Sequence, residues 1–587
     1  MKRSLTISKQ EDFSMDQSFI FDRVKPLHAF YRPFIMGNNG AVSCNNYYAT
    51  KAGLEVLAKG GNAADAAVAV SLVLGVTEPY HSGIGGGCFT LYYDKAKDQF
   101  LSLDARGMAP IKAHRDMFLD KDGNVDKTWE WFDGKSVAAP QLYRALEALN
   151  KEHGTMSIAE LSQPAIDLAR DGFTCNFLYE FAMNHPLCGH AASHSEYYKK
   201  TYMKNGEKYK FGEKITNPDL ADTMEKVAKN GIDWFYCGDV ADKMVECVQA
   251  RDGVLTKEDL EKCHAKRRPV VRGNFQGYDI VSMSPPSSGG SHIIQMLNIL
   301  ENFDLKKMGH NSAEYLHVLC ETIKLMFADR SVAMGDPDYV KVDVERIISK
   351  AYAKECAARI KMDEAQEFSA SEGIEAKEYE GNTTHFSIID KDGNMIAQTQ
   401  TVRSYWGSSV MCEGYGFIMN NAMSDFSAKV GTLTTQGLVY GTANGIEGGK
   451  TPLSSMTPTL VFKDGMPLMS VGAAGGPRII TGTLQLLLNV LAFDMNMDEA
   501  LQAGYINCLT KAQGLEYEPW ITPDTIRLLA EKGHIMAPCG RGNLLSTMVN
   551  GVMRYGDRFQ ACANNRHDGC GGVLMDDGRM AFGGITF

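Results

Sequence analysis

The sequence predicts an α+β fold in which a helix-rich part of the chain precedes a strand-rich part. Helical patterns fill most of the first two-thirds, whereas short alternating segments separated by polar turns follow from Thr383 onward. The 587 residues are 44% hydrophobic, which is enough for a large core. No Pro/Ser-rich linker, charge block, low-complexity tract or internal repeat marks a domain boundary.

Capping residues mark the ends of several expected helices. Gly60-Gly61 ends the first helix, Asn62 caps the second, and Thr256 with Asp259 fits a capping box. Alanine-rich faces on the first two helices indicate that they pack closely. The expected helices span residues 49–59, 62–74, 141–152, 158–170, 217–229, 256–263, 290–302, 312–334 and 480–491.

A β-hairpin is expected at the start of the strand-rich part. Asp390 and Asn394 flank the three-residue loop 391–393, whose last residue is a glycine suited to a left-handed conformation. Counting back from this turn places Thr383 opposite Thr401, roughly 5 Å away across the hairpin. Two hydroxyl groups would then lie side by side.

This pair suggests a concealed nucleophile. An internal threonine hydroxyl is a weak nucleophile, but cleavage of the preceding peptide bond would give Thr383 a free α-amino group that can act as its general base. The hairpin alone does not decide the matter, because strands are rich in threonine for structural reasons. The rest of the sequence has to supply the evidence.

Charge indicates what kind of partner to expect. The formal net charge is −11, from 60 basic and 71 acidic residues, which argues against nucleic acid or an anionic membrane surface as a partner. A small-molecule substrate fits better.

Targeting signals and cysteine usage predict a cytoplasmic protein. Residues 1–12 carry two early basic residues without an apolar run of signal-peptide length, and no later stretch is long enough to span a membrane. The 14 cysteines lack Cys-x-x-Cys pairs, which suits reduced thiols. Cys188 near His190, and Cys263 near His264, are too sparse for a zinc site and are interpreted as structural.

Six further segments occur in an order that resembles the γ-glutamyltransferase family of N-terminal-nucleophile hydrolases. With the Thr383 segment they cover most of the chain, and they are residues 60–70, 78–87, 103–110, 420–426, 452–459 and 475–480. The resemblance implies a four-layer αββα sandwich, with two central sheets covered by helices. It also implies one composite unit that self-cleaves into a large subunit, residues 1–382, and a small subunit, residues 383–587.

The resemblance assigns roles to individual residues. Thr383 would cut the chain before itself and then serve as the nucleophile, with Thr401 supporting it. The backbone N–H groups of Gly475 and Gly476 would stabilise the oxyanion. The remaining matches concern a substrate α-carboxylate, which would be held by Arg106, Ser454 and Ser455. No metal or organic cofactor is implied.

The amino side of the substrate site departs from the family pattern. Relatives acting on γ-glutamyl groups usually have Asn at the position of Arg403 and Glu or Gln at that of Ala422, so only Asp425 of that trio survives. A γ-glutamyl α-ammonium would meet a like charge at Arg403. Two alternatives follow: Arg403 pairs with Asp425 or swings away, leaving a weakened γ-glutamyl site, or it binds a second anionic or carbonyl group on another acyl donor.

The pocket entrance is also expected to differ. Residues 428–450 match a glycine-rich loop that covers the pocket in many relatives, and Gln436 stands where they often have an aromatic residue.

The expected function is that of an amide hydrolase or acyltransferase. It would cleave γ-glutamyl or related carboxylate-bearing amides through an acyl-enzyme, with water or an amine as acceptor. One alternative is an acylase for a non-amino acyl group, glutaryl-like or oxamate-like. Another is a non-catalytic homologue acting as a binding or scaffold protein. An unrelated cysteine enzyme is disfavoured, because no local signature of a cysteine nucleophile is present.

Overall fold

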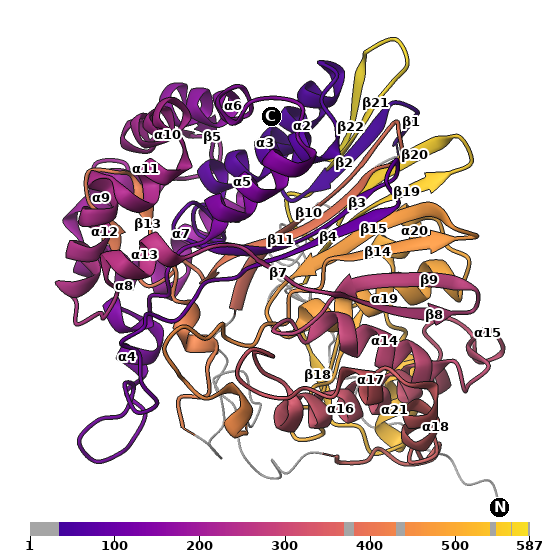
Figure 1. Cartoon of the computed structure of the whole chain (residues 1–587). Coiled ribbons are helices and arrows are strands. Elements are labelled where there is room, and N and C mark those ends of the chain that lie inside the picture. The colour runs from indigo at the N-terminus through magenta and orange to yellow at the C-terminus, as the bar shows by residue number, and fades with distance from the viewer. Residues whose placement is uncertain (1–34, 369–380, 430–440, 540–546, 565, 585–587) are drawn as a thin grey trace, which may run out of the picture.

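Two antiparallel β-sheets face each other at the centre of the structure, and helices cover both outer faces (Figure 1). The computed structural model describes residues 35–368, 381–429, 441–539, 547–564 and 566–584. Strands of the first sheet pack on the second through contacts of β10 (Gly381–Asp390) with β15 (Met466–Ala474) and β19 (Met548–Tyr555). The expected α+β sandwich is therefore confirmed.

The first sheet has eight strands in the order β22-β21-β2-β10-β11-β3-β4-β7. The hairpin strands β10 and β11 lie in its middle, and each has an outer neighbour from the first part of the chain. The other strands of this sheet are β2 (Gly40–Cys44), β3 (Gly87–Asp94), β4 (Gln99–Ala105), β7 (Lys266–Arg267), β11 (Met395–Ser404), β21 (Cys570–Leu574) and β22 (Met580–Gly584).

The second sheet has seven strands in the order β1-β20-β19-β15-β14-β9-β8. Strand β15 lies in its middle and ends immediately before the paired glycines 475 and 476. Its remaining strands are β1 (Ile35–Gly37), β8 (Val270–Phe275), β9 (Tyr278–Met283), β14 (Thr459–Lys463) and β20 (Arg558–Ala563).

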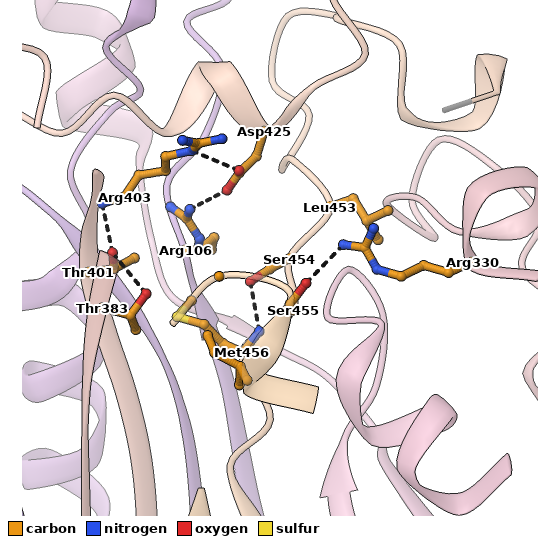
Figure 2. Close-up of a pocket in the computed structure, with 12 residues that line it drawn as sticks. Arg106, Arg330, Thr383, Thr401, Arg403, Asp425, Leu453, Ser454, Ser455 and Met456 are labelled. Carbon is orange, nitrogen blue, oxygen red and sulfur yellow. Dashed lines mark hydrogen bonds and ion pairs between the residues drawn. The ribbon is translucent and has the colours of Figure 1, made fainter. Parts of the chain in front are cut away.

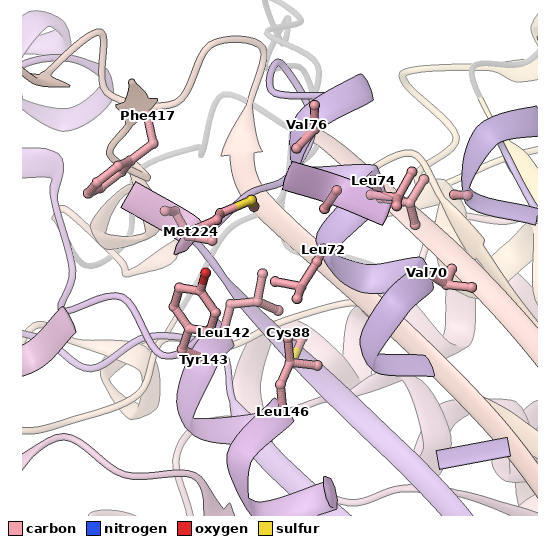
Figure 3. Packing of buried hydrophobic residues seen from close by; sticks show 14 of the residues in the cluster. Val70, Leu72, Leu74, Val76, Cys88, Leu142, Tyr143, Leu146, Met224 and Phe417 are labelled. Atoms are coloured by element: carbon pink, nitrogen blue, oxygen red, sulfur yellow. The ribbon is translucent and has the colours of Figure 1, made fainter. Parts of the chain in front are cut away.

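Different helices cover the two sheets. Those against the eight-stranded sheet are α2 (Tyr47–Ala58), α3 (Ala63–Thr77) and α5 (Leu142–His153), and those against the seven-stranded sheet are α14 (Gly289–Leu300), α19 (Arg478–Leu491) and α20 (Met497–Gln502). All 15 residues of α3 are buried. This agrees with its mostly apolar sequence, since a helix that is apolar on all sides needs neighbours around it. Figure 3 shows Leu72 of α3 near Leu142 and Leu146 of α5.

The nine helices expected from the sequence are all present close to their predicted bounds. The remaining four are α6 (Ile158–Asp171), α10 (Pro218–Asn230), α13 (Lys257–Lys262) and α16 (Ala313–Ala333). The predicted cap at Asn62 is confirmed, since its side chain accepts from the N–H groups of Ala64 and Asp65. The capping box of Thr256 and Asp259 is confirmed as well.

Short elements escaped the sequence analysis, because two or three turns carry too little periodicity to identify a helix. These helices are α4 (Lys127–Trp131), α7 (Phe177–Asn184), α8 (Pro186–His194), α9 (Glu196–Tyr202), α11 (Ile232–Cys237), α12 (Asp239–Gln249), α15 (Leu305–Met308), α17 (Val344–Ile347), α18 (Lys350–Ala357) and α21 (Pro523–Glu531). The small strands are β5 (Phe173–Thr174), β6 (Lys214–Ile215), β12 (Met411–Cys412), β13 (Phe417–Ile418), β16 (Ile506–Asn507), β17 (Leu515–Tyr517) and β18 (Met536–Pro538).

The hairpin turn forms as predicted. The N–H of Asp390 donates to the carbonyl of Asn394 at 3.1 Å, and Gly393 has φ = +86°. Pairing keeps the predicted register from Thr384, opposite Gln400, to Ile389. The register then shifts between Asn382 and Thr384, so Thr383 lies at a β-bulge that the sequence analysis did not anticipate.

Two expectations fall on residues outside the described part of the chain. The expected cytoplasmic location rests partly on residues 1–12, which lie outside the described residues, and it remains a prediction. Gln436 in the glycine-rich loop also lies outside the described residues. Among the described helices, none combines the length and apolar character that crossing a membrane requires.

We predict that Gly472→Ala in β15 lowers the thermal unfolding midpoint. A methyl group there would lie 2.3 Å from His385 Cε1 of β10, and His385 is held by Thr399 and Ser387. Overpacking of this kind costs about 1–3 kcal/mol. The control is Gly189→Ala on exposed α8, where the added carbon meets nothing within 4 Å. Scanning calorimetry giving equal midpoints for both variants would contradict the tight packing of the two sheets.

Candidate active site

A pocket lies where β10 begins and β11 ends (Figure 2). Residues on both sides of Thr383 in the chain contribute to its wall. They are Arg106, Arg330, Thr383, Thr401, Arg403, Asp425, Leu453, Ser454, Ser455, Met456, Gly476 and Ile479. Eight of the nine residues predicted for the site therefore line one pocket, and the ninth, Gly475, is adjacent in the chain to Gly476.

The two threonine hydroxyls meet in this pocket as the hairpin register predicted. Thr383 Oγ1 lies 3.5 Å from Thr401 Oγ1. Thr401 Oγ1 donates to the carbonyl oxygen of Asn382 at 2.6 Å and accepts the backbone N–H of Arg403 at 2.7 Å. The Asn382 carbonyl belongs to the peptide bond that precedes Thr383, so Thr401 polarises the bond expected to be cut.

The backbone at Arg403 is unusual for a residue with a side chain. Its φ is +86°, in the left-handed region that non-glycine residues rarely adopt. Arg403 pairs with Asn382 at the shifted end of the hairpin ladder. The bulge and this conformation together allow one hydroxyl, Thr401 Oγ1, to contact the backbone of both strands.

Asp425 joins two of the three arginines that line the pocket, Arg106 and Arg403. Its Oδ2 lies 2.5 Å from Arg106 Nη2, and its Oδ1 lies 2.9 Å from Arg403 Nε. Arg106 follows β4, whereas Asp425 ends the 3₁₀ helix η2 (Ala422–Asp425). The pairing of Arg403 with Asp425, which the first sequence alternative expects, is thus present, and it does not by itself decide which acyl group binds. Arg403 also stacks on Trp131, with its guanidinium carbon 3.9 Å from the ring centroid.

The buried cluster of Arg106, Arg403 and Asp425 has two positive charges and one negative charge. Desolvation lowers the pKa of Arg106, and nearby Arg403 lowers it further, while Asp425 raises it. Within the described residues, Arg106 Nε, Arg106 Nη1 and Arg403 Nη1 are buried and have no hydrogen-bond partner. Each such donor costs about 1–3 kcal/mol if it stays unsatisfied. The site is therefore suited to an acceptor-rich, anionic ligand.

Arg330 is a site residue that the sequence analysis missed. It comes from α16, is 2% exposed, and donates from Nη2 to Ser455 Oγ at 3.1 Å and from Nε to Ser288 Oγ at 2.8 Å. Ser455 and Ser454 themselves lie in the wall of the pocket. A charged residue near the end of a largely apolar helix was a signal in the sequence, but nothing local indicated which segment it contacts.

The paired glycines connect β15 to α19. Both have positive φ, +127° at Gly475 and +61° at Gly476, and α19 begins two residues later at Arg478. Glycine suits this position because it adopts such dihedrals without steric cost. Backbone N–H groups at the start of a helix favour negative charge, which is compatible with the predicted oxyanion role.

One further cluster in the described part of the chain has the composition of a metal site. His317, Glu321 and His534 offer ligand atoms within 4.8 Å of one another. However, Lys324 Nζ lies 2.6 Å from Glu321 Oε1, and His317 Nδ1 lies 2.8 Å from His534 Nε2. The lysine ammonium already supplies the positive charge that a metal ion would bring, so we interpret the cluster as structural.

Comparison with known proteins identifies the family of the chain. A family model described as gamma-glutamyltranspeptidase matches residues 49–573. The chain is 40% identical over 504 residues to the glutathione hydrolase proenzyme of Escherichia coli (strain K12), covering 86% of this chain and 87% of the relative. It is 33% identical over 507 residues to the acylase ACY 1 proenzyme of Pseudomonas sp. (strain V22), covering 85% and 87%.

A solved structure confirms the fold. The crystal structure of cephalosporin acylase from Bacillus halodurans superposes with a TM-score of 0.81 over 94% of this chain and 97% of that chain, at 24% identity. The four-layer αββα sandwich of the N-terminal-nucleophile hydrolase type is the fold of this chain. The range matched by the family model includes every residue of the pocket. Because the family model matches most of the chain, residues 49–573, the chain belongs to the γ-glutamyltranspeptidase family.

Proposed function

We propose that this chain is an amide hydrolase or acyltransferase that first cleaves itself before Thr383. It then acts on γ-glutamyl or related amides whose acyl group carries a carboxylate. One observation carries the proposal: the hydroxyls of Thr383 and Thr401 and the Asn382 carbonyl meet at a pocket that contains Arg106.

Self-cleavage begins with attack of Thr383 Oγ1 on the Asn382 carbonyl carbon. The hydrogen bond from Thr401 to that carbonyl, 2.6 Å long, stabilises the negative charge that develops on its oxygen. The C–N bond breaks, an ester to Thr383 Oγ1 forms, and the hydroxyl proton passes to the nitrogen. Water then hydrolyses the ester. The products are a large subunit, residues 1–382, and a small subunit, residues 383–587, whose first residue has a free α-amine.

That α-amine acts as the general base in turnover. It accepts the proton of the Thr383 hydroxyl, which attacks the substrate amide carbonyl and forms an acyl-enzyme. The N–H groups of Gly475 and Gly476 stabilise the oxyanion. The leaving amine takes the proton, and water or an acceptor amine then releases the acyl group from Thr383.

The acyl group is positioned by its carboxylate. Arg106 has two buried donors without a partner among the described residues, and Ser454 and Ser455 present hydroxyls in the same pocket. Arg330 positions Ser455 through the 3.1 Å hydrogen bond to its Oγ. The names of two relatives, glutathione hydrolase proenzyme and acylase ACY 1 proenzyme, support both the maturation step and the substrate class.

We predict that purified wild-type protein consists of two fragments whose junction lies between Asn382 and Thr383. Thr383→Ala removes the attacking hydroxyl and should yield one uncut chain, whereas Thr383→Ser keeps a hydroxyl and should still be cut. Intact-mass spectrometry distinguishes these results. One uncut chain in all three proteins would instead favour a non-catalytic homologue.

Thr401→Val is predicted to slow self-cleavage about 100-fold or more. It removes the donor to the Asn382 carbonyl while keeping the shape of the side chain, and one oxyanion donor typically contributes about 2.7–4 kcal/mol. Thr401→Ser serves as the matched control and should stay within about tenfold of the wild-type rate. The rate is measured by following loss of the uncut chain after synthesis in a cell-free system. Equal rates for the valine and serine variants would argue against this role.

Arg330→Gln is predicted to raise the KM for carboxylate-bearing amides about tenfold while kcat changes little. Loss of a charged hydrogen bond frees the Ser455 hydroxyl, and about 1.4 kcal/mol of binding corresponds to that factor. Arg330→Lys, which keeps the charge, should recover part of the loss. Steady-state kinetics on the self-cleaved proteins tests this. A change confined to kcat, or no recovery by lysine, would count against a positioning role.

A further inference from the structure

Asp425 is the only carboxylate among the described residues that line the pocket. Both of its oxygens are engaged, Oδ2 by Arg106 at 2.5 Å and Oδ1 by Arg403 at 2.9 Å. A substrate ammonium that approached this carboxylate would have to share it with two guanidinium groups. Like charges at such separations repel, and burial strengthens the repulsion.

The net charge of the lining residues also argues against a substrate ammonium. Arg106, Arg330 and Arg403 contribute three positive charges, whereas Asp425 contributes one negative charge. A γ-glutamyl group adds a carboxylate and an ammonium, so it leaves this imbalance unchanged. An acyl group with a carboxylate and no ammonium reduces it.

Unused donors on Arg106 and Arg403 are the groups that such a carboxylate would engage. Arg106 Nε, Arg106 Nη1 and Arg403 Nη1 are buried without a partner in the described part of the chain. Figure 2 shows the two side chains converging on Asp425 beside Thr401 and Thr383. A substrate carboxylate that bound beside Asp425 and reached these donors would accept hydrogen bonds from both arginines, because it has two oxygens with several acceptor sites.

Arg403 is also held in place, so it does not leave room for an ammonium by a simple rotation. Its guanidinium stacks on Trp131 at 3.9 Å and pairs with Asp425, and its side chain is only 3% exposed. Its backbone N–H is fixed by Thr401 Oγ1. Moving the guanidinium away would break both side-chain contacts.

We propose that the preferred acyl donor is a monoamide of a dicarboxylic acid, of the glutaryl type, which has no α-ammonium and whose free carboxylate binds to Arg106 and Arg403 beside Asp425. The inference rests on the proposed function, since it names the substrate class of the same site. In the reaction the amide C–N bond breaks, an ester to Thr383 forms, the leaving amine takes a proton, and water releases the dicarboxylate.

Two chromogenic amides test the inference directly. Glutaryl-p-nitroanilide and γ-glutamyl-p-nitroanilide differ only in the α-amino group. With self-cleaved wild-type enzyme and water as acceptor, we expect kcat/KM for the glutaryl compound to be at least tenfold higher. A tenfold preference for the γ-glutamyl compound, or equal values, would overturn the inference and leave the proposed function intact. If self-cleaved enzyme turns over neither compound and forms no acyl-enzyme, the proposed function fails as well.

Variants of Arg403 identify the source of the preference. Arg403→Gln should lower kcat/KM for the glutaryl compound at least tenfold and raise it for the γ-glutamyl compound. Arg403→Lys keeps the positive charge and should retain the glutaryl preference. The matched control is Arg579→Gln, in an exposed turn with a side chain 82% exposed, which should change neither value. Intact mass verifies that each variant has folded and self-cleaved. An unchanged substrate ratio in Arg403→Gln would overturn the role of Arg403.

Discussion

The pairing of β10 with β11 in the middle of the eight-stranded sheet is the constraint on which the site depends. It brings Thr383 to Thr401, and the bulge at Thr383 turns the Asn382 carbonyl toward the Thr401 hydroxyl. The outer neighbours of this hairpin, β2 and β3, come from the first part of the chain. Cleavage before Thr383 would therefore leave both products joined by these two ladders, by three more (β2 with β21, β1 with β20 and β9 with β14) and by the packing of the sheets.

The pocket has an uncharged part and a charged part. At the hairpin end, neutral hydroxyls and backbone groups surround the peptide bond before Thr383. Beyond it, a buried arginine pair shares a single aspartate. Burying charge is costly unless it is compensated, so this arrangement has its main advantage when an anionic ligand completes it. The charged part comes from both sides of Thr383, because Arg106 precedes Thr383 in the chain and Arg403 and Asp425 follow it.

Local sequence signals predicted the local structure well. Asn62 and Thr256 cap their helices as expected, and the turn at Gly393 sets the register that the hairpin keeps as far as Thr384. The layers of the sandwich could be predicted only through the resemblance, because pairing of strands far apart in the chain leaves no periodic pattern. The bulge at Thr383, the left-handed backbone of Arg403 and the contact of Arg330 with Ser455 all depend on tertiary packing. No single segment of the sequence contains that information.

We propose that Thr383 carries the acyl group during turnover beside a carboxylate-binding pair of arginines. Rapid acid quenching of self-cleaved enzyme with an amide substrate, followed by peptide mass mapping, tests it most directly. We expect one acyl group, attached as an ester to the threonine that begins the small subunit. An acyl group on any other residue, or none while product is being released, would contradict it.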